Sequence, residues 1–246
     1  MKKYDVLIIG AGPAGIFAAR ELVWQNPDIR VLLVDKGRKI QERQCPIPKT
    51  GKCAHCQPCA IMNGWAGAGA FSDGKLSLSP DVGGQLADYV GYGKVQDMIR
   101  YTDELYCGYG APDKVHGLNS KGVDDIAYAA SRHSILLVPC PVRHMGTETG
   151  FEVLKNIYVD LVESGKIEFR PLTPVADILV KDGQVTGAVL QNPDGSREEI
   201  SAAKIIAAPG RGGAEWLTRQ AHQLELKTIN NAVDIGVRVE TPNSVM

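Results

Sequence analysis

The chain lacks a long hydrophobic run and lacks an excess of charge of either sign. No uninterrupted apolar stretch reaches the roughly 18 residues that a membrane-spanning helix needs. The 27 Lys and Arg residues nearly balance the 28 Asp and Glu residues, which gives a formal net charge of −1. This balance provides no electrostatic attraction to nucleic acid or to an anionic membrane, so neither is expected as a partner.

Several catalytic patterns and a secretory signal are also missing. The sequence contains no H-E-x-x-H zinc motif, no G-x-x-x-x-G-K-[ST] phosphate loop, no Ser-His-Asp arrangement and no internal repeat. Lys2 and Lys3 precede an apolar run as in a signal peptide, but Asp5 and three glycines interrupt that run. We therefore expect a cytoplasmic protein that acts on a small molecule.

The most informative feature that is present is a glycine-rich turn after a buried strand. The expected strand covers residues 6–9, and Gly10, Gly12 and Gly15 follow with the spacing G-x-G-x-x-G. In this pattern the first glycine permits a tight turn, the second lets the backbone approach a pyrophosphate, and the third lets the helix pack closely on the sheet. The helix N-terminus then offers free N–H groups to the phosphates.

The residues around this turn also fit dinucleotide binding. Apolar residues at positions 14, 17, 18 and 22 have helical spacing, and a second strand over residues 30–34 ends at Asp35. An acid about twenty residues after the motif is where a carboxylate accepts hydrogen bonds from the adenosine ribose. The predicted fold class is therefore α/β, a Rossmann-like FAD/NAD(P)-binding domain with a parallel sheet.

The middle of the chain is expected to contain a long irregular segment followed by helices and short strands. A stretch rich in Gly, Pro and Cys covers residues 36–85. Helices are expected over residues 86–106 and 122–133, and a further helix from the capping box at Thr149–Glu152 to near Gly165. Short strands are expected at residues 134–138 and 167–170.

A β-meander is expected over residues 175–207. Strands over residues 175–180 and 185–191 flank a turn at Asp182-Gly183, and a turn at residues 193–195 leads to a last strand that ends at Ala207. A second turn of small residues follows: Ala208, Pro209, Gly210, Arg211, Gly212 and Gly213. Glycines after a buried strand indicate a backbone held close to a ligand. The alternative is an ordinary turn that only ends the strand.

Four of the six cysteines are clustered in the irregular segment, at Cys45, Cys53, Cys56 and Cys59. Three cysteines at C-x2-C-x2-C spacing resemble the run that holds an iron–sulfur cluster in bacterial ferredoxins, with Cys45 as a fourth ligand. Zinc bound by four thiolates, a redox-active dithiol and inert thiols are the alternatives. Cys107 and Cys140 are isolated and are expected to be small buried residues.

The end of the chain shows the pattern of one more strand. Residues Val233 to Glu240 alternate between apolar and polar side chains. No further strands follow that would complete a sheet. We expect residues 229–246 to be the start of a truncated C-terminal region.

The glycine turn, Asp35 and the meander that ends in Ala-Ala-Pro-Gly resemble FAD-dependent oxidoreductases of the glutathione-reductase-like class. More narrowly, residues 67–76 (GAGAFSDGKL), 143–147 (RHMGT) and 208–211 (APGR) resemble the family of uncharacterised FAD-dependent dehydrogenases. The chain departs from that family at Trp65-Ala66, where a further small residue is expected, and in lacking a longer C-terminal region. The resemblance implies an FAD-binding domain over residues 1–228 with a helical and loop segment inserted at about residues 36–165.

The resemblance also implies a set of cofactor-binding residues. The pyrophosphate would lie at Gly10, Ala11, Gly12, Pro13, Ala14 and Gly15, the ribose at Asp35 and Lys36, and the adenine at the backbone of Val175, with Ala208 to Arg211 near the ligand. Arg43 would contact the ribityl or phosphate side, and Gly67, Gly69, Ser72, Asp73 and Lys75 would lie near the isoalloxazine. A cation such as Lys75 would stabilise the anionic reduced ring.

His144 is the candidate general acid, because an ordinary imidazole pKa suits proton transfer near neutral pH. A structural, hydrogen-bonded histidine is the alternative. The expected function is an FAD-dependent oxidoreductase of unknown substrate, with a [4Fe-4S] cluster or Zn and with NAD(P)H as candidate electron donor. An electron-transfer partner or the missing C-terminal region would complete it. The alternatives are an NAD-dependent dehydrogenase and a catalytically incomplete flavin-binding fragment.

Overall fold

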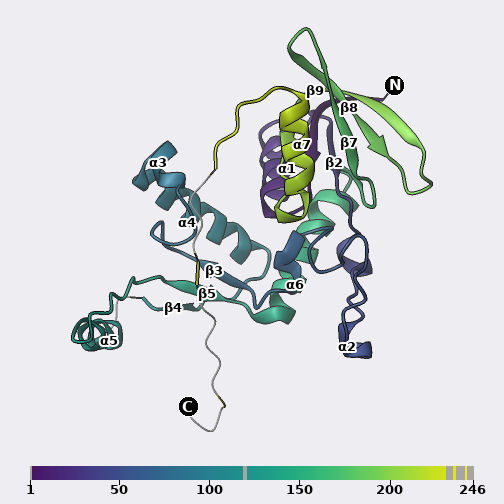
Figure 1. The fold of residues 1–246 in the computed structure, drawn as a ribbon. Coiled ribbons are helices and arrows are strands. Elements are labelled where there is room, and N and C mark those ends of the chain that lie inside the picture. The colour runs from purple at the N-terminus through teal and green to yellow at the C-terminus, as the bar shows by residue number, and fades with distance from the viewer. Residues whose placement is uncertain (1, 119–120, 231–234, 237–241, 243–246) are drawn as a thin grey trace.

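A computed structural model describes residues 2–118, 121–230, 235–236 and 242 of the chain. Its main layer is a six-stranded sheet in the order β6-β2-β1-β9-β8-β7, and a smaller sheet in the order β3-β5-β4 lies beside it (Figure 1). The strands of the main sheet are β1 (Lys3–Ile9), β2 (Val31–Val34), β6 (Glu168–Arg170), β7 (Val175–Lys181), β8 (Gln184–Gln191) and β9 (Arg197–Ala207).

Three parallel strands of this sheet end level with one another. Ile9 of β1 is paired with Val34 of β2 on one side and with Ala207 of β9 on the other. Because parallel strands point the same way, the residues that follow them leave the sheet at the same edge. This pairing therefore brings the glycine turn, Asp35 and the second turn of small residues together, as α/β folds do at their ligand sites.

Strand β9 joins the parallel part of the sheet to the meander. Its first residues pair antiparallel with β8, and its later residues, from Ser201 onward, pair parallel with β1. The meander over residues 175–207 is therefore confirmed, as is the short strand near residue 170. The sheet that contains parallel strands confirms the predicted α/β fold class.

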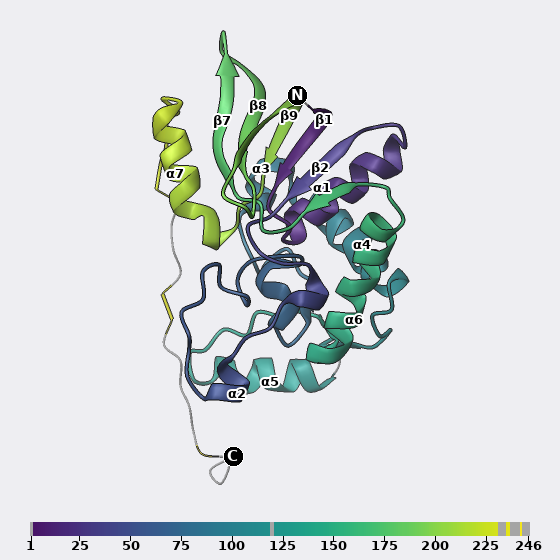
Figure 2. The ribbon, with the colours of Figure 1, turned by 90° about the vertical axis from the view of Figure 1, so that its right-hand side faces the viewer.

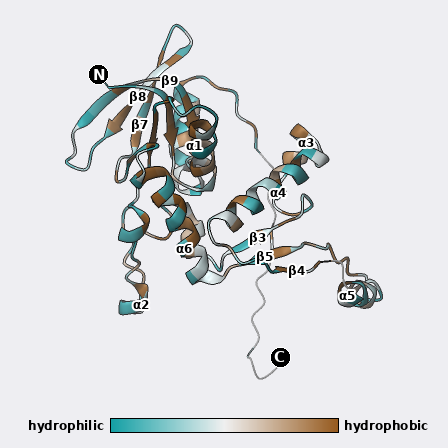
Figure 3. Ribbon diagram, turned by 180° about the vertical axis from the view of Figure 1, so that it is seen from behind, coloured by the Kyte–Doolittle hydropathy of each residue, from teal (hydrophilic) through white to brown (hydrophobic). Residues whose placement is uncertain are grey.

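Helices pack on one face of the main sheet and beside its last strand. Helices α1 (Pro13–Gln25) and α6 (Gly146–Tyr158, continued by a π-helical turn at Val159–Glu163) pack on one face, while α7 (Ala214–Gln223) lies beside β7 (Figure 2). The hydrophobic residues are concentrated in the strands and along the inward sides of α1 and α6 (Figure 3). The remaining helices are α2 (Ile47–Thr50), α3 (Leu86–Val90), α4 (Tyr92–Gly108) and α5 (Lys121–Ser131).

The smaller sheet consists of β3 (Lys75–Ser77), β4 (Val115–His116) and β5 (Val142–His144), and short 3-10 turns lie at Ile40–Glu42, Gly67–Phe71 and Arg211–Gly213. The buried Arg143 of β5 holds this sheet to α4, because its guanidinium donates to both carboxylate oxygens of Asp103 at 2.6 and 2.7 Å. It also donates to the carbonyl of Pro112. A bidentate pair of this kind fixes direction as well as distance.

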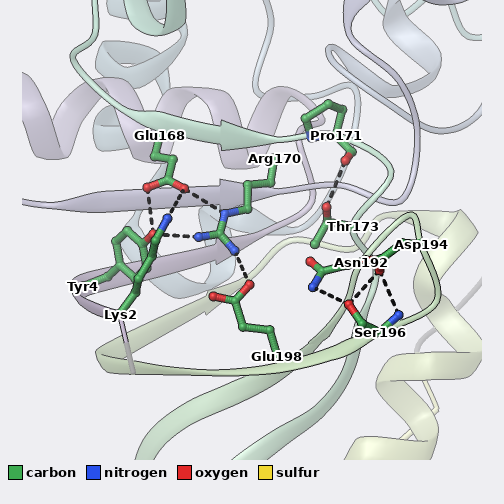
Figure 4. A network of polar contacts seen from close by, with 10 residues as sticks. All are labelled: Lys2, Tyr4, Glu168, Arg170, Pro171, Thr173, Asn192, Asp194, Ser196 and Glu198. Carbon is green, nitrogen blue, oxygen red and sulfur yellow. Dashed lines mark hydrogen bonds and ion pairs between the residues drawn. The ribbon is translucent and has the colours of Figure 1, made fainter.

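A polar network joins three strands of the main sheet (Figure 4). Tyr4 donates its hydroxyl hydrogen to Glu168 at 2.7 Å, and Arg170 donates to Glu168 at 2.8 Å and to Glu198 at 2.9 Å. The network therefore connects β1, β6 and β9. Burial, followed by the hydrogen bond to Glu168, raises the pKa of Tyr4 to about 12.

Three local expectations are wrong. The helix expected over residues 86–106 is two helices, because Gly91 has a φ of 88° between α3 and α4. Residues 134–138 form no strand, and Leu136 is 86% exposed, so no buried surface selects an extended pairing there. Helix α6 begins before Thr149 with Met145 as its N-cap and with no side-chain cap, so the capping box does not form.

No helix among the described residues has both the length and the apolar composition required to cross a membrane. The strand expected over residues 233–240 lies outside the described residues, except for Ile235 and Gly236, which are in no regular element.

Candidate dinucleotide-binding site

A cavity of about 710 Å³ lies at the edge where β1, β2 and β9 end. Its size is in the range of small-molecule and cofactor sites. Of the residues predicted from the sequence, the cavity is lined by Gly10, Gly12, Pro13, Asp35, Lys36, Gly67, Val175, Ala208, Pro209, Gly210 and Arg211. These come from five separate segments of the chain, which the fold brings to one place.

The three glycines of the first turn have different physical roles. A Cβ on Gly10 would lie 2.2 Å from the carbonyl oxygen of Ala208, and a Cβ on Gly15 would lie 1.9 Å from that of Gly10. Both positions therefore need glycine for the fold itself. A Cβ on Gly12 would meet no protein atom within 4 Å. The position that a side chain would take at Gly12 is therefore open space, and Gly12 lines the cavity. That is the expected arrangement where a backbone is approached by a ligand.

The N-terminus of α1 provides hydrogen-bond donors at this point. Gly12 is the N-cap, Pro13 occupies the first helical turn, and the first helical hydrogen bond runs from the Ile16 N–H to the Gly12 carbonyl at 3.0 Å. The N–H groups of Ala14 and Gly15 therefore have no acceptor within the helix. Together with the helix dipole, they favour an anion such as a phosphate.

Asp35 organises the turn around the cavity. Its carboxylate accepts hydrogen bonds from the backbone N–H groups of Ala11 at 2.8 Å, Gly37 at 2.7 Å and Gly64 at 2.8 Å. An ionised carboxylate has about four acceptor positions, so one position is left for a ribose hydroxyl. Ala11 is fully buried and its N–H is held by Asp35, which makes it a support of the turn.

The cavity wall carries more positive than negative side chains. Lys36, Arg197, Arg211 and Arg219 line it, and Asp35 and Asp177 are the acids. None of the four cations forms an ion pair with the described part of the chain. A cationic, partly enclosed wall favours an anionic ligand.

Arg43 does not line the cavity. It is 4% exposed and donates to the backbone carbonyls of Ala60 at 2.9 Å, Ile61 at 2.7 Å and Trp65. Burial lowers the pKa of Arg43 to about 10. The guanidinium holds the loop that leads to Gly67, so its role is structural and the expectation that it contacts the cofactor is not supported.

The other residues expected near the isoalloxazine lie outside the cavity wall. Gly69 lies in the 3-10 turn, and Ser72, Asp73 and Lys75 follow it toward the smaller sheet, where Lys75 is paired with His144 across β3 and β5. Lys75 also forms an ion pair with Asp73 at 2.7 Å, and the hydrogen bond from Lys75 lowers the pKa of Asp73. The fold thus brings the two candidate catalytic residues, Lys75 and His144, together, but on the smaller sheet.

The four clustered cysteines are not arranged as a metal site. Within the described part of the chain, which includes all four, no three His, Cys, Asp or Glu side chains converge as ligands. Cys53 and Cys56 are exposed, whereas Cys45 and Cys59 are partly buried. Helix α2, capped by Gly51 in a left-handed conformation, separates Cys45 from the others. Sequence spacing alone does not make thiolates converge, and the arrangement of the described residues does not support the predicted iron–sulfur cluster or zinc site.

Sequence reasoning missed the far wall of the cavity. Asn63 and Thr173 lie near Asp35, and the wall continues through Gln191 and Arg197 at the end of the β8–β9 hairpin to Trp216 and Arg219 on α7. The i, i+3 spacing of Trp216 and Arg219 places them on one helix face. Nothing in the sequence indicates which way that face points.

The fold and the cavity define a dinucleotide-binding α/β protein, and comparison with known families makes this more specific. Residues 80–237 match the model of the FAD binding domain family, which is well over half of the 246 residues. The chain therefore belongs to this family. Residues 5–45, which contain the glycine turn and Asp35, are also similar to the lycopene cyclase protein family.

A solved structure with a TM-score above 0.5 agrees on the fold. A 3-ketosteroid-Δ4-(5α)-dehydrogenase from Rhodococcus jostii RHA1 is 17% identical with a TM-score of 0.51, and the match covers 84% of this chain and 45% of that one. A quinol fumarate reductase FrdA variant from E. coli is 19% identical with a TM-score of 0.48 over 85% of this chain and 33% of its own. The chain thus spans less than half the length of these two proteins.

Proposed function

We propose that the chain binds FAD in the cavity at the carboxyl edge of β1, β2 and β9, as part of a flavin-dependent oxidoreductase. The observation that carries the proposal is the open space at Gly12, which faces the cavity between the start of α1 and Asp35. When bound, FAD would supply electron transfer between a donor and an acceptor. We place the chain, more narrowly, among the uncharacterised FAD-dependent dehydrogenases of the glutathione-reductase-like class.

The chain's own residues have separate tasks in this proposal. The N–H groups of Ala14 and Gly15 bind the pyrophosphate, and Asp35 accepts from a ribose hydroxyl while it holds the turn in place. Lys75 and His144 face the same side of the smaller sheet, because directly paired residues of antiparallel strands do so. We assign to this face the stabilisation of negative charge on the reduced flavin and the transfer of a proton.

Reconstitution with FAD tests the binding. The purified protein, incubated with FAD and passed over a desalting column, should retain one flavin per chain with a visible flavin spectrum. Gly12→Val is the control that should retain none. If the wild-type chain retains no FAD but binds NAD⁺, the NAD-dependent dehydrogenase alternative replaces this proposal.

The assignment of Lys75 has a separate measurement. Lys75→Met should make the reduction potential of the bound flavin more negative, because a nearby cation stabilises the anionic reduced ring. Lys94→Met, on the exposed side of α4, is the matched control and should leave the potential unchanged. Equal potentials in the two variants would remove Lys75 from the site. Bleaching of the flavin by NADH or NADPH under anaerobic conditions tests the proposed electron donor.

A further inference from the structure

Helix α7 occupies the outer edge of the last strand of the main sheet. β7 is hydrogen-bonded to β8 alone among the described strands, so its other edge has no strand partner there. On that edge the Trp216 Nε1–H donates to the carbonyl of Ala176 at 3.1 Å, and the backbone N–H of Ile178 donates to Oε1 of Gln220 at 2.8 Å. Side chains of α7 thus take the place of a neighbouring strand.

Gln220 fixes the position of the helix along β7. Its side chain is 2% exposed, and its amide nitrogen donates to Gln223 at 2.7 Å while its oxygen accepts from Ile178. A buried amide that lost these partners would carry a large desolvation cost. The helix therefore cannot slide along the strand without breaking buried hydrogen bonds.

Trp216 is held in a defined orientation at the cavity wall. Its ring nitrogen is bonded to Ala176, the residue next to Val175, and its side chain is half-buried and lines the cavity. The wall beyond Asp35, away from the glycine turn, runs through Val175 to this indole. A dinucleotide whose pyrophosphate lies at Gly12 and whose ribose lies at Asp35 has its base in this part of the cavity.

We propose that Trp216 is the contact surface for the adenine base, and that Gln220 is the positioning residue that holds it there. This proposal rests on the proposed function. It names the adenosine diphosphate half of the cofactor as the ligand of this wall. Aromatic rings bind bases by stacking, which depends on the ring and not on the indole N–H.

Tryptophan fluorescence tests the contact directly. The chain has three tryptophans: Trp24 is 50% exposed, Trp65 is fully buried and Trp216 lines the cavity. Addition of ADP should change the emission of the wild-type protein and of Trp24→Phe, and should leave the emission of Trp216→Phe unchanged. An ADP-dependent change that persists in Trp216→Phe would overturn the proposal.

Binding measurements separate a stacking role from a structural one. Trp216→Leu should weaken ADP and FAD by about tenfold each, whereas Trp216→Phe, which keeps a ring and loses the N–H, should retain most of the affinity. Inorganic pyrophosphate, which has no base, should bind both variants equally. Equal losses of ADP affinity in the two variants would show that only the hydrogen bond to Ala176 matters.

The measurements distinguish a failure of the proposed function from a failure of the role proposed for Trp216. If the wild-type chain binds neither FAD nor ADP, the proposed function is wrong. If it binds both and Trp216→Leu binds them equally well, only the role of Trp216 is wrong. If Trp216→Leu does not fold, the fluorescence comparison between Trp24→Phe and Trp216→Phe still decides the proposal.

Discussion

Replacing Gly12 with valine should abolish cofactor binding while leaving the protein folded. Gly12 has φ −76° and ψ 179°, which is extended backbone that any residue adopts. The added Cβ would meet no protein atom within 4 Å. Since the folded state has room for the side chain, and since glycine is the more flexible residue in the unfolded chain, we expect the free energy of unfolding to change by less than about 1 kcal/mol.

The loss of binding follows from the same open space. A valine side chain would occupy the volume in front of the N-terminus of α1 and displace the phosphates from the N–H groups of Ala14 and Gly15. Hydrogen bonds to a charged group contribute about 1.5–3 kcal/mol each, so the loss of two costs about 3–6 kcal/mol. That corresponds to a Kd raised at least about 100-fold.

The assay combines flavin titration with urea unfolding of the cofactor-free protein. Gly15→Val is the matched variant, because its Cβ would lie 1.9 Å from the Gly10 carbonyl oxygen and should prevent folding. The reasoning is refuted if Gly12→Val binds FAD with wild-type affinity. It is also refuted if the two glycine variants are equally unstable, since the structure assigns the conflict to Gly15 alone.

Three further outcomes are expected. Asp35→Ala leaves three backbone N–H donors without their acceptor, so urea unfolding should show a loss of about 2–4 kcal/mol, and unchanged stability would contradict this role. Tyr4 has a raised pKa of about 12, so the stability it contributes is complete below about pH 10 and is lost as the pH rises toward 12. The difference in unfolding free energy between wild type and Tyr4→Phe should shrink over that range, and a constant difference would exclude the effect. Iodoacetamide should alkylate the exposed Cys53 and Cys56 before Cys107, whose pKa is raised by burial, and protection of the first two in freshly purified protein would indicate a bound metal.

The parts of the fold that the sequence predicts well are those where local chemistry and tertiary packing agree. The glycine turn, the strand that ends at Asp35 and the β-meander each combine an apolar pattern with residues that suit the turn. The capping box at Thr149 fails because packing of α6 against the sheet selects an earlier start, and a cap contributes only about 1 kcal/mol. Residues 134–138 fail because β-branched and apolar residues form a strand only where a partner strand is present.

The candidate site is predictable to a similar extent and for a similar reason. The residues of the glycine turn, Asp35 and Val175 stand at strand ends, so their meeting follows from a parallel sheet. Arg43 is misassigned because a buried guanidinium that holds backbone carbonyls has the same sequence signature as one that binds phosphate. The cysteine spacing does not decide whether a metal site forms, because it fixes the number of intervening residues and leaves the directions of the side chains open.

The position of α7 connects the protection of the sheet edge with the shape of the cavity. An edge strand with unpaired N–H and C=O groups is a site for association with other chains, and proteins cover such edges. Here the residue that covers Ala176 also lines the cavity, so one indole serves both purposes. A change at Trp216 or Gln220 that released α7 would therefore expose the edge of β7 and open the adenine end of the cavity together. Ligand that holds the base against Trp216 should in turn keep α7 on the strand, so cofactor binding and resistance to association are expected to change in parallel.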